Sequence, residues 1–376
     1  MRTQSNFRLL VVRLGAMGDI LHALPAVTAL RQAHPSWIID WVVEPCWQAL
    51  LSAEAASPAT FCAIDGSVKE TPFQSPRSLA QPVVDHLHFA PTKAWRKAPF
   101  SRQTLHEIKA LRSTLRAGKY NVVLDLQGAI RSAVVARLAG CRRLIGEAEP
   151  RERVARWLFT ERVTTRGAHV IEQDVELASA IAGDPLVPVT PWLPVDPVAE
   201  AWADEILPPT AEQPAVLISP GAGWGAKRWP AERYSVVAQG LIERGFRVLV
   251  NCGPGEEALA EVIVQGTRGA ATSVSCSLAQ LIALTRRVAL EIAGDTGPLH
   301  LACALDRPVV GIYGPTDPSR NGPFGTRFQV LRSPQSRRDH TRRAAPEAGL
   351  LIIQPDDVLR AADALLYSET AHGTAL

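Results

Sequence analysis

The length, composition and charge of the chain exclude several classes of protein. Its 376 residues are 47% hydrophobic and 20% charged, which is ordinary for a globular protein. This length makes two domains the default expectation. With 40 Lys and Arg against 37 Asp and Glu, the formal net charge of +3 is too small for a dedicated nucleic-acid binder. An anionic partner must therefore be bound by a local basic patch.

The cysteines and apolar runs indicate neither disulfides nor membrane spans. The N-terminal apolar run is short and is interrupted by Arg13, and nowhere do about 18 uncharged apolar residues follow one another. We therefore expect a soluble protein, and contact with a membrane surface stays open. The cysteines are scattered without a C-x-x-C pair or metal-ligand spacing, as in a cytosolic protein with reduced thiols: Cys46, Cys62, Cys141, Cys252, Cys276 and Cys303.

The first half of the chain alternates predicted strands and helices. A glycine loop follows the first strand, and apolar residues at three-residue steps from Leu21 to Leu30 predict a helix that Pro25 either starts or kinks. This alternation predicts a parallel sheet covered on both faces. The predicted strands span residues 8–12, 38–43 and 121–126, a basic helix spans 105–115, and proline-rich residues 52–100 are expected to form long loops with short strands.

A proline-rich stretch, residues 183–214 with one short helix near 199–206, reads as a linker and precedes a second alternating series. Two doubly wound domains in tandem would place a ligand in the cleft where the carboxyl ends of both sheets face each other. The second series comprises strands 215–219 and 246–251, helices 230–244, 256–264 and 278–285, and a last helix 355–366 that Asp356 caps. We expect domains at 1–185 and 215–353, a linker at 186–214 and a terminal helical segment at 354–376.

Residues 288–322 predict a strand, a turn, a short helix and a second strand around Asp295-Thr296-Gly297-Pro298. Free N–H groups and the helix dipole make such a turn a site for a pyrophosphate or a carboxylate. Asp295 and Thr296 equally fit simple N-caps, and His300 on the helix fits either a phosphate contact or a structural role. This turn, called the 295–298 corner below, does not by itself decide between these interpretations.

A glycine loop at residues 219–230, SPGAGWGAKRWP, lets the backbone approach a ligand and places Lys227 beside it. Together with the 295–298 corner, it would clamp a diphosphate from two sides. Lys227 also fits a solvated loop lysine. Glu256 fits either an acceptor for ribose hydroxyls or a first-turn helix glutamate.

Asp19 directly follows Gly18 at a predicted helix N-terminus, where its charged form is favoured. It fits a general base or a helix cap, because G-x-x-G-D is neither a dinucleotide fingerprint nor a Walker A loop. We place residues 93–102, KAWRKAPFSR, on a loop whose basic and aromatic side chains suit an anionic lipid head group or simply aid solubility. A second basic run, residues 336–343, is interpreted as mobile rather than functional.

Several motifs, in order over nearly the whole chain, resemble the lipopolysaccharide heptosyltransferases of glycosyltransferase family 9. The motifs are RLLVVRLGAMGDILHALPAVTALR, DWVVEP, AWRKAPFS, VVLDLQGAIRSA, AKRWPAERY and AGDTGPLHLACALDRPVVGIYGPTDP. The resemblance implies an α/β protein of the GT-B class, with two tandem Rossmann-like domains and a ligand cleft between them. The first domain would bind the acceptor, the second would bind the nucleotide sugar, and the last helix would cross back to the first domain.

The resemblance also implies a reaction. The family transfers L-glycero-D-manno-heptose from ADP-heptose, with inversion and without a metal or cofactor, onto the Kdo region of a lipid A precursor. The enzyme would lie in the cytoplasm, peripheral to the inner membrane, and we expect a monomer. A nucleotide-sugar epimerase and a non-catalytic sugar-nucleotide-binding protein of the same fold are the alternatives, although no separate acid/base set of an epimerase is evident.

The family's catalytic aspartate falls on Asp19. The chain departs from the pattern of these heptosyltransferases at the glycine loop, where Ala222 and Gly223 replace paired threonines, and at Cys276, which replaces an adenine-lining methionine. Residues 67–82 also form a longer connection. Donor-binding positions fall on Ala222, Gly223, Lys227, Glu256, Cys276, Asp295, Thr296, Gly297 and His300, and acceptor-binding positions on Gly18, Arg96, Lys97 and Arg131.

Overall fold

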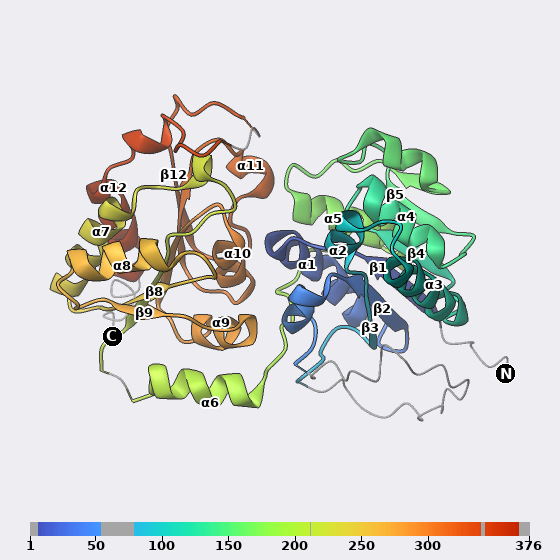
Figure 1. Cartoon of the computed structure of the whole chain (residues 1–376), viewed down its shortest axis with the longest axis horizontal. Coiled ribbons are helices and arrows are strands. Elements are labelled where there is room, and N and C mark those ends of the chain that lie inside the picture. The colour runs from blue at the N-terminus through green and yellow to red at the C-terminus, as the bar shows by residue number, and fades with distance from the viewer. Residues whose placement is uncertain (1–6, 54–78, 211, 340–342, 368–376) are drawn as a thin grey trace, which may run out of the picture. The chain divides into compact units, whose positions relative to one another are not determined.

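The computed structural model describes residues 7–53, 79–210, 212–339 and 343–367, and it contains two six-stranded parallel sheets (Figure 1). The chain divides into two compact units, each built on one sheet. The first unit takes in residues up to Leu14, Arg31–Val163 and Trp192–Val198, and the second takes in Gly15–Leu30, Thr164–Pro191 and the chain from Ala199 on. The predicted α/β class with two parallel sheets is confirmed.

The sheet of the first unit has the strand order β3-β2-β1-β4-β5-β6. Leu111 and Leu115 of one helix and Ala133 and Ala136 of another pack with the apolar strand residues in a single core cluster. The strands are β1 (Arg8–Val12), β2 (Ile38–Val43), β3 (His86–Phe89), β4 (Val122–Asp125), β5 (Leu144–Glu147) and β6 (Glu161–Val163), and the helices are η1 (Pro45–Leu50), α2 (Thr92–Lys97), α3 (Arg102–Ala117), α4 (Ile130–Leu138) and η3 (Arg153–Leu158).

The sheet of the second unit has the order β12-β11-β10-β7-β8-β9. Its strands are β7 (Ala215–Ser219), β8 (Arg247–Asn251), β9 (Thr272–Val274), β10 (Leu290–Gly294), β11 (Val309–Tyr313) and β12 (Phe328–Arg332). Its helices are α1 (Met17–Ala33, grouped here as far as Leu30), α5 (Val170–Ala182), α6 (Pro197–Ile206), η4 (Gly225–Lys227), α7 (Ala231–Glu243), α8 (Glu257–Gly266), α9 (Leu278–Thr285), α10 (Gly297–Ala304), α11 (Pro318–Asn321), η5 (Leu350–Ile352) and α12 (Pro355–Leu366).

Side chains that alternate along the strands cover the two faces of this second sheet with different helices. Ile292 and Val310 pack in the core cluster of α7, α8 and α12, whereas Ala293 and Val309 pack against α10. The chain adds β8 and β9 on one side of β7 and then crosses to add β10, β11 and β12 on the other. The carboxyl ends of β7 and β10 therefore flank the topological switch point, where open α/β sheets bind ligands.

Several predicted elements are confirmed with their bounds, namely the strands at 8–12, 38–43 and 215–219 and the helix at 278–285. The helix α1 continues past Pro25, which lies inside it. The predicted loop at 93–102 is wrong, because α2 ends at Lys97 and α3 begins at Arg102. Trp95 explains the helix, since it is buried in the core and its Nε1 donates to Glu107 Oε2 at 2.7 Å.

The last helix, α12, packs within the second unit, and the predicted crossing back to the first unit stays a prediction. The apolar face of α12, which includes Val358, Ala362 and Leu365, packs against α7 and the sheet of the second unit. That face is sufficient to hold the helix there, because its buried residues join the main core of this unit. Residues 368–376 of the predicted segment 354–376 lie outside the described residues.

The compact units also differ from the expected boundaries at 1–185, 186–214 and 215–353. Residues 15–30 and 164–191 group with the second unit although they precede the predicted linker. The short helix α6 in that linker is fixed to α9, since Ala199 and Ala203 pack on Ala283 and Asp204 accepts from Arg287 Nη2 at 2.8 Å. Most of the predicted long connection, residues 67–78, lies outside the described residues.

Candidate active site in the second unit

Asp295 and Thr296 connect β10 to α10 at the carboxyl edge of the second sheet. Thr296 is the N-cap residue, with extended backbone angles of φ −144° and ψ 169°, and its hydroxyl lies 3.3 Å from the carbonyl oxygen of Gly294. Pro298 takes the second helical position, where its missing N–H removes no intrahelical hydrogen bond. The predicted strand, turn and helix are present, and the amino end of α10 follows the switch point directly.

Asp295 pairs with two basic side chains. Lys227 Nζ forms a close ion pair with Oδ2 of Asp295, and His300 Nε2 lies 3.3 Å from Oδ1. Only 9% of the Asp295 side chain and 12% of the Lys227 side chain are exposed. Burial raises the pKa of Asp295, but the hydrogen bond from His300 and the charge of Lys227 outweigh burial and lower this pKa well below its usual range. Asp295 is therefore a buried, ionised carboxylate between two donors.

The loop after β7 positions Lys227. Its ammonium lies 4.4 Å from the centre of the Trp224 ring, at the distance of a cation–π interaction. Sequence reasoning did not select Trp224, although an aromatic residue three positions before the lysine was available as a signal. Gly223 of the same loop is exposed, and no atom lies within 4 Å of an ideal Cβ at this position. Ala222 beside it is buried.

The glycine loop also meets Glu256. A Cβ at Gly221 would lie 1.8 Å from Glu256 Oε1, so a side chain at position 221 would displace the Glu256 carboxylate from its present place. Glu256 is the N-cap residue of α8, and its Oε2 accepts from the backbone N–H of Gly253 at 3.1 Å. This side chain makes no capping hydrogen bond to α8, and contact with a ribose stays a prediction.

Cys276 follows β9, next to β8 in the sheet. It is partly buried, and burial, with a smaller contribution from Cys252, raises the pKa of its thiol to about 11. A thiol with this pKa is neutral at pH 7, which suits a largely apolar lining position. The structure therefore places Lys227, Glu256, Cys276 and Asp295 after four neighbouring strands of one sheet.

The first turn of α1 packs on the first turn of α10 within the second unit. A Cβ at Gly297 would lie 2.4 Å from Met17 Sδ, and a Cβ at Gly18 would lie 2.9 Å from His300 Cδ2. Both glycines are needed for this approach. Asp19 follows in the same turn of α1 and is partly exposed, and its Oδ2 accepts from the Ala16 backbone N–H at 3.1 Å. This capping contact leaves a carboxylate chemically able to accept a proton, because a carboxylate has several acceptor sites.

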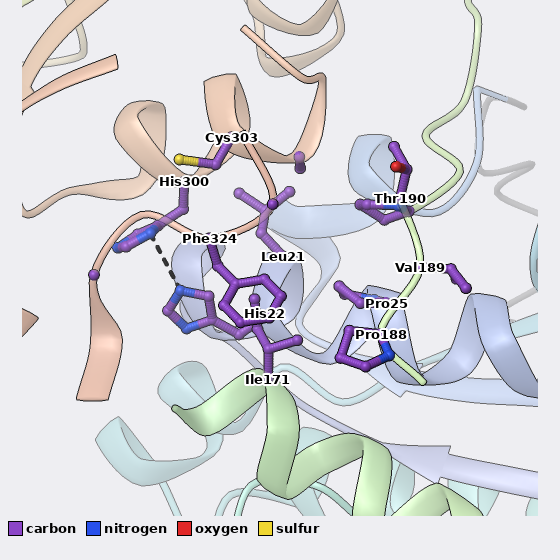
Figure 2. Close-up of a pocket in the computed structure, with 14 residues that line it drawn as sticks. Leu21, His22, Pro25, Ile171, Pro188, Val189, Thr190, His300, Cys303 and Phe324 are labelled. Carbon is purple, nitrogen blue, oxygen red and sulfur yellow. Dashed lines mark hydrogen bonds between the residues drawn. The ribbon is translucent and has the colours of Figure 1, made fainter. Parts of the chain in front are cut away.

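His22 is a functional candidate that sequence reasoning missed. It lies on α1, and its Nε2 is 3.1 Å from Nδ1 of His300; both side chains are buried. Figure 2 shows the two rings pointing toward one another at the wall of a cavity of about 230 Å³. Leu21, Ile171 and Phe324 also line this cavity, which lies within the second unit. His22 sits in an apolar helix pattern, so the sequence gives no local signal of this contact.

Three of the four predicted acceptor-binding residues lie in the first unit. Arg96 and Lys97 are exposed in the last turn of α2, and Arg131 is exposed in the first turn of α4. Gly18, the fourth, belongs to the second unit. Phe100, three residues after Lys97 in the sequence, is 90% exposed. Acceptor binding by these residues stays a prediction.

The described part of the basic run 336–343 forms backbone hydrogen bonds with two other segments of the second unit. The backbone N–H of Asp339 donates to the carbonyl oxygen of Pro315 at 3.1 Å, and that of Ala226 donates to Arg343 at 3.0 Å. Asp339 is thus bonded to the turn after β11 and Arg343 to the loop that carries Lys227, and the interpretation of this run as mobile stays a prediction. Residues 340–342 lie outside the described residues.

Two further properties concern only the part of the chain that the structure describes. Its His, Cys, Asp and Glu side chains form no group of three that would hold a metal ion. None of its helices combines the length and apolar character needed to cross a bilayer.

The site defines a class of protein before any relative is considered. A charged cluster and a glycine loop at the switch point of a doubly wound parallel sheet are typical of nucleotide-binding proteins. The sequence profile of glycosyltransferase family 9 (heptosyltransferase) matches residues 108–350. The chain belongs to this family and is a glycosyltransferase.

Known proteins of similar length support this assignment. The chain is 30% identical to lipopolysaccharide heptosyltransferase 1 of Escherichia coli K12 over 332 residues, 87% of this chain and 94% of the relative. It is 26% identical to lipopolysaccharide heptosyltransferase 3 of Escherichia coli over 368 residues, 96% of this chain and 99% of the relative. The solved structure of Escherichia coli heptosyltransferase WaaC with ADP has a TM-score of 0.74 and 26% identity, and it covers 96% of this chain and 100% of that one. The predicted GT-B class of fold is confirmed.

Proposed function

We propose that the protein transfers L-glycero-D-manno-heptose from ADP-heptose to the Kdo region of a lipid A precursor, as heptosyltransferase I. The relative that is 30% identical carries the name lipopolysaccharide heptosyltransferase 1. A structurally similar heptosyltransferase was solved with ADP. The observation that carries the proposal is the Lys227–Asp295–His300 cluster at the switch point of the second sheet.

In this proposal the cluster receives the leaving group. The Lys227 ammonium has three donors, so it serves Asp295 and a phosphate oxygen together. The amino end of α10 adds the positive end of a helix dipole, and open space at Gly223 lets the backbone approach the diphosphate. These groups stabilise the charge that develops on departing ADP, so we propose a reaction that uses neither a metal nor a cofactor.

Asp19 is the proposed general base. It takes the proton from the acceptor hydroxyl while that oxygen attacks the anomeric carbon, and a single displacement of this kind inverts the configuration there. Glu256 and Cys276 are proposed to contact the ribose and the adenine. We assign the Kdo-bearing acceptor to Gly18, Arg96, Lys97 and Arg131, and we expect a cytoplasmic monomer in peripheral contact with the inner membrane.

The deciding experiment incubates the purified protein with ADP-heptose and Kdo-lipid A and measures ADP release and heptosylated product. The proposal predicts stoichiometric formation of both. An epimerase would convert the donor without acceptor, and a non-catalytic binding protein would retain ADP-heptose unchanged. If only a core that already bears one heptose accepts the sugar, the protein is a later heptosyltransferase, such as heptosyltransferase II, and the assignment to heptosyltransferase I is wrong.

A further inference from the structure

We infer that His22 is a positioning residue that holds His300 in the tautomer that donates to Asp295, and thereby keeps the Lys227–Asp295 pair in place for a nucleoside diphosphate. The inference rests on the proposed function only in assigning the diphosphate to this corner. Its physical basis lies entirely within the second unit.

A continuous line of hydrogen bonds joins α1 to the loop after β7. His22 Nε2 lies 3.1 Å from His300 Nδ1, and His300 Nε2 lies 3.3 Å from Asp295 Oδ1 (Figure 2 shows the first contact). The other carboxylate oxygen of Asp295 pairs with Lys227. Both imidazoles are only 6% exposed, so water does not readily replace either partner. A change at His22 is therefore transmitted to Asp295 through a single ring.

The charge of Asp295 fixes the direction of these hydrogen bonds. An ionised carboxylate only accepts, so the proton between His300 and Asp295 resides on His300 Nε2. In a neutral imidazole the other nitrogen is then an acceptor, and it needs a donor. His22 Nε2–H supplies that donor. Without it, the buried His300 Nδ1 loses its partner, and the ring gains by rotating or by moving its proton to Nδ1.

A neighbouring histidine does not share this role. His169 meets the edge of the His22 ring at 5.6 Å between centroids, but both of its nitrogens are engaged by the backbone. Its Nε2 donates to the carbonyl oxygen of Gly322 at 3.1 Å, and its Nδ1 accepts from the N–H of Ile171 at 3.2 Å. His169 therefore anchors α5, and only His22 contacts the ring of His300 through a nitrogen among the described histidines.

The position of His22 on α1 explains why this helix would carry it. His22 follows Asp19 by three residues, so the two side chains project from neighbouring positions of one helical face. Gly18 lies in the same turn, and a Cβ at this position would lie 2.9 Å from His300 Cδ2, so the turn runs close to the ring. One rigid helix thus carries the proposed base and orients a residue of the proposed donor site.

Two variants of His22 test the inference. His22→Leu fills the space without a donor, whereas the amide N–H of His22→Gln reaches the former position of Nε2. We expect the Leu variant to bind ADP about 10-fold more weakly by calorimetry and the Gln variant to stay within about threefold of wild type. In the transfer assay the loss should raise KM for the donor and leave KM for the acceptor unchanged. Leu21→Ala is the matched control, because it removes a buried side chain from the same helix and cavity but no hydrogen bond.

A readout without ligand separates this inference from the proposed function. Nitrogen-15 spectra of histidine-labelled protein report the His300 tautomer directly, and we expect the Nε2–H form in wild type and His22→Gln but not in His22→Leu. Failure of heptosyl transfer leaves this result standing. The inference is overturned if His22→Leu retains the wild-type tautomer and ADP affinity, or if the Gln variant loses both to the same extent while its melting temperature matches that of wild type.

Discussion

Replacing Lys227 by methionine tests whether Asp295 depends on a buried ion pair. Methionine keeps the apolar stem beside Trp224 but removes the ammonium. Removing one partner of a buried pair commonly costs about 3–5 kcal/mol, because an uncompensated charge remains. Here His300 still donates to Asp295, and a hydrogen bond to a charged group contributes about 1.5–3 kcal/mol. We therefore expect Lys227→Met to lower the unfolding free energy by about 2–4 kcal/mol at pH 7.

The double variant Lys227→Met/Asp295→Asn provides the control. It removes both charges, so no unpaired carboxylate is left in the core of the site, and we expect it to be about 1–2 kcal/mol more stable than Lys227→Met alone. Urea unfolding of the ligand-free protein, followed by tryptophan fluorescence, measures both values. If Lys227→Met costs less than about 0.5 kcal/mol, or if the double variant is the less stable of the two, the pair does not hold Asp295 as argued.

The pH dependence of the same variants follows from the sign of the pKa shift. The pKa of Asp295 is lower in the folded protein than its ordinary value of 3.8, so the ionised form contributes stability above that pH. This contribution is lost as the pH falls through the range between 3.8 and the lower folded pKa. The stability difference between wild type and Lys227→Met should therefore be full at pH 6–7 and should shrink below about pH 4.

The remaining predictions concern three other carboxylates. Asp19→Asn keeps an acceptor for the Ala16 N–H and should fold and bind ADP normally, yet lose about 10²–10⁴-fold in transfer rate. Gly221→Ala should displace Glu256 and weaken ADP binding about 10-fold, with no added effect in a Glu256→Ala background. Burial raises the pKa of Glu291 from 4.5 to about 8, so between these values the folded protein holds a proton that the unfolded chain has released. The unfolding free energy of wild type should therefore fall by about 1.4 kcal/mol for each unit that the pH rises in this range, and Glu291→Gln should remove this slope.

Each of these three predictions has a result that would contradict it. Wild-type turnover in Asp19→Asn would leave Asp19 as a cap alone. Additive effects of Gly221→Ala and Glu256→Ala on ADP affinity would show that the glycine is required for another reason. A stability curve that stays flat between pH 5 and 8 in wild type would mean that Glu291 is ionised in the folded protein, contrary to its burial.

Local sequence patterns predicted the parts of the structure that local forces determine. The strands at 8–12 and 215–219 have the predicted bounds because they are continuous apolar runs buried on both faces. The helix α2 was missed because its formation depends on Trp95, whose partner Glu107 lies in the next helix. Contacts between distant residues leave no such local pattern.

The residues of the candidate site divide in the same way. Lys227 and Asp295 were predicted because each follows an apolar strand at a glycine-containing turn. His22 was missed because the apolar period of α1 surrounds it and its partner lies 278 positions away. The grouping of α1 with the second unit was equally unpredictable, since it depends on the close approach of Gly18 and Gly297 to side chains far along the chain.

The two sheets share one topology but differ at their switch points, and this difference supports the proposed position of the nucleotide. Each sheet places its third, second, first, fourth, fifth and sixth strands side by side in that order. At the first switch point, Asp125 Oδ1 accepts from the N–H groups of Gln127 and Gly128 at 2.8 Å, and Gln127 Oε1 accepts from Leu14 N–H at 2.8 Å, so these two oxygens are paired with backbone donors next to the strand ends. At the second, the carboxylate is paired with an ammonium that retains donors for an anion. Both sheets have a switch point, and the paired charges after β7 and β10 favour the second one for the proposed diphosphate.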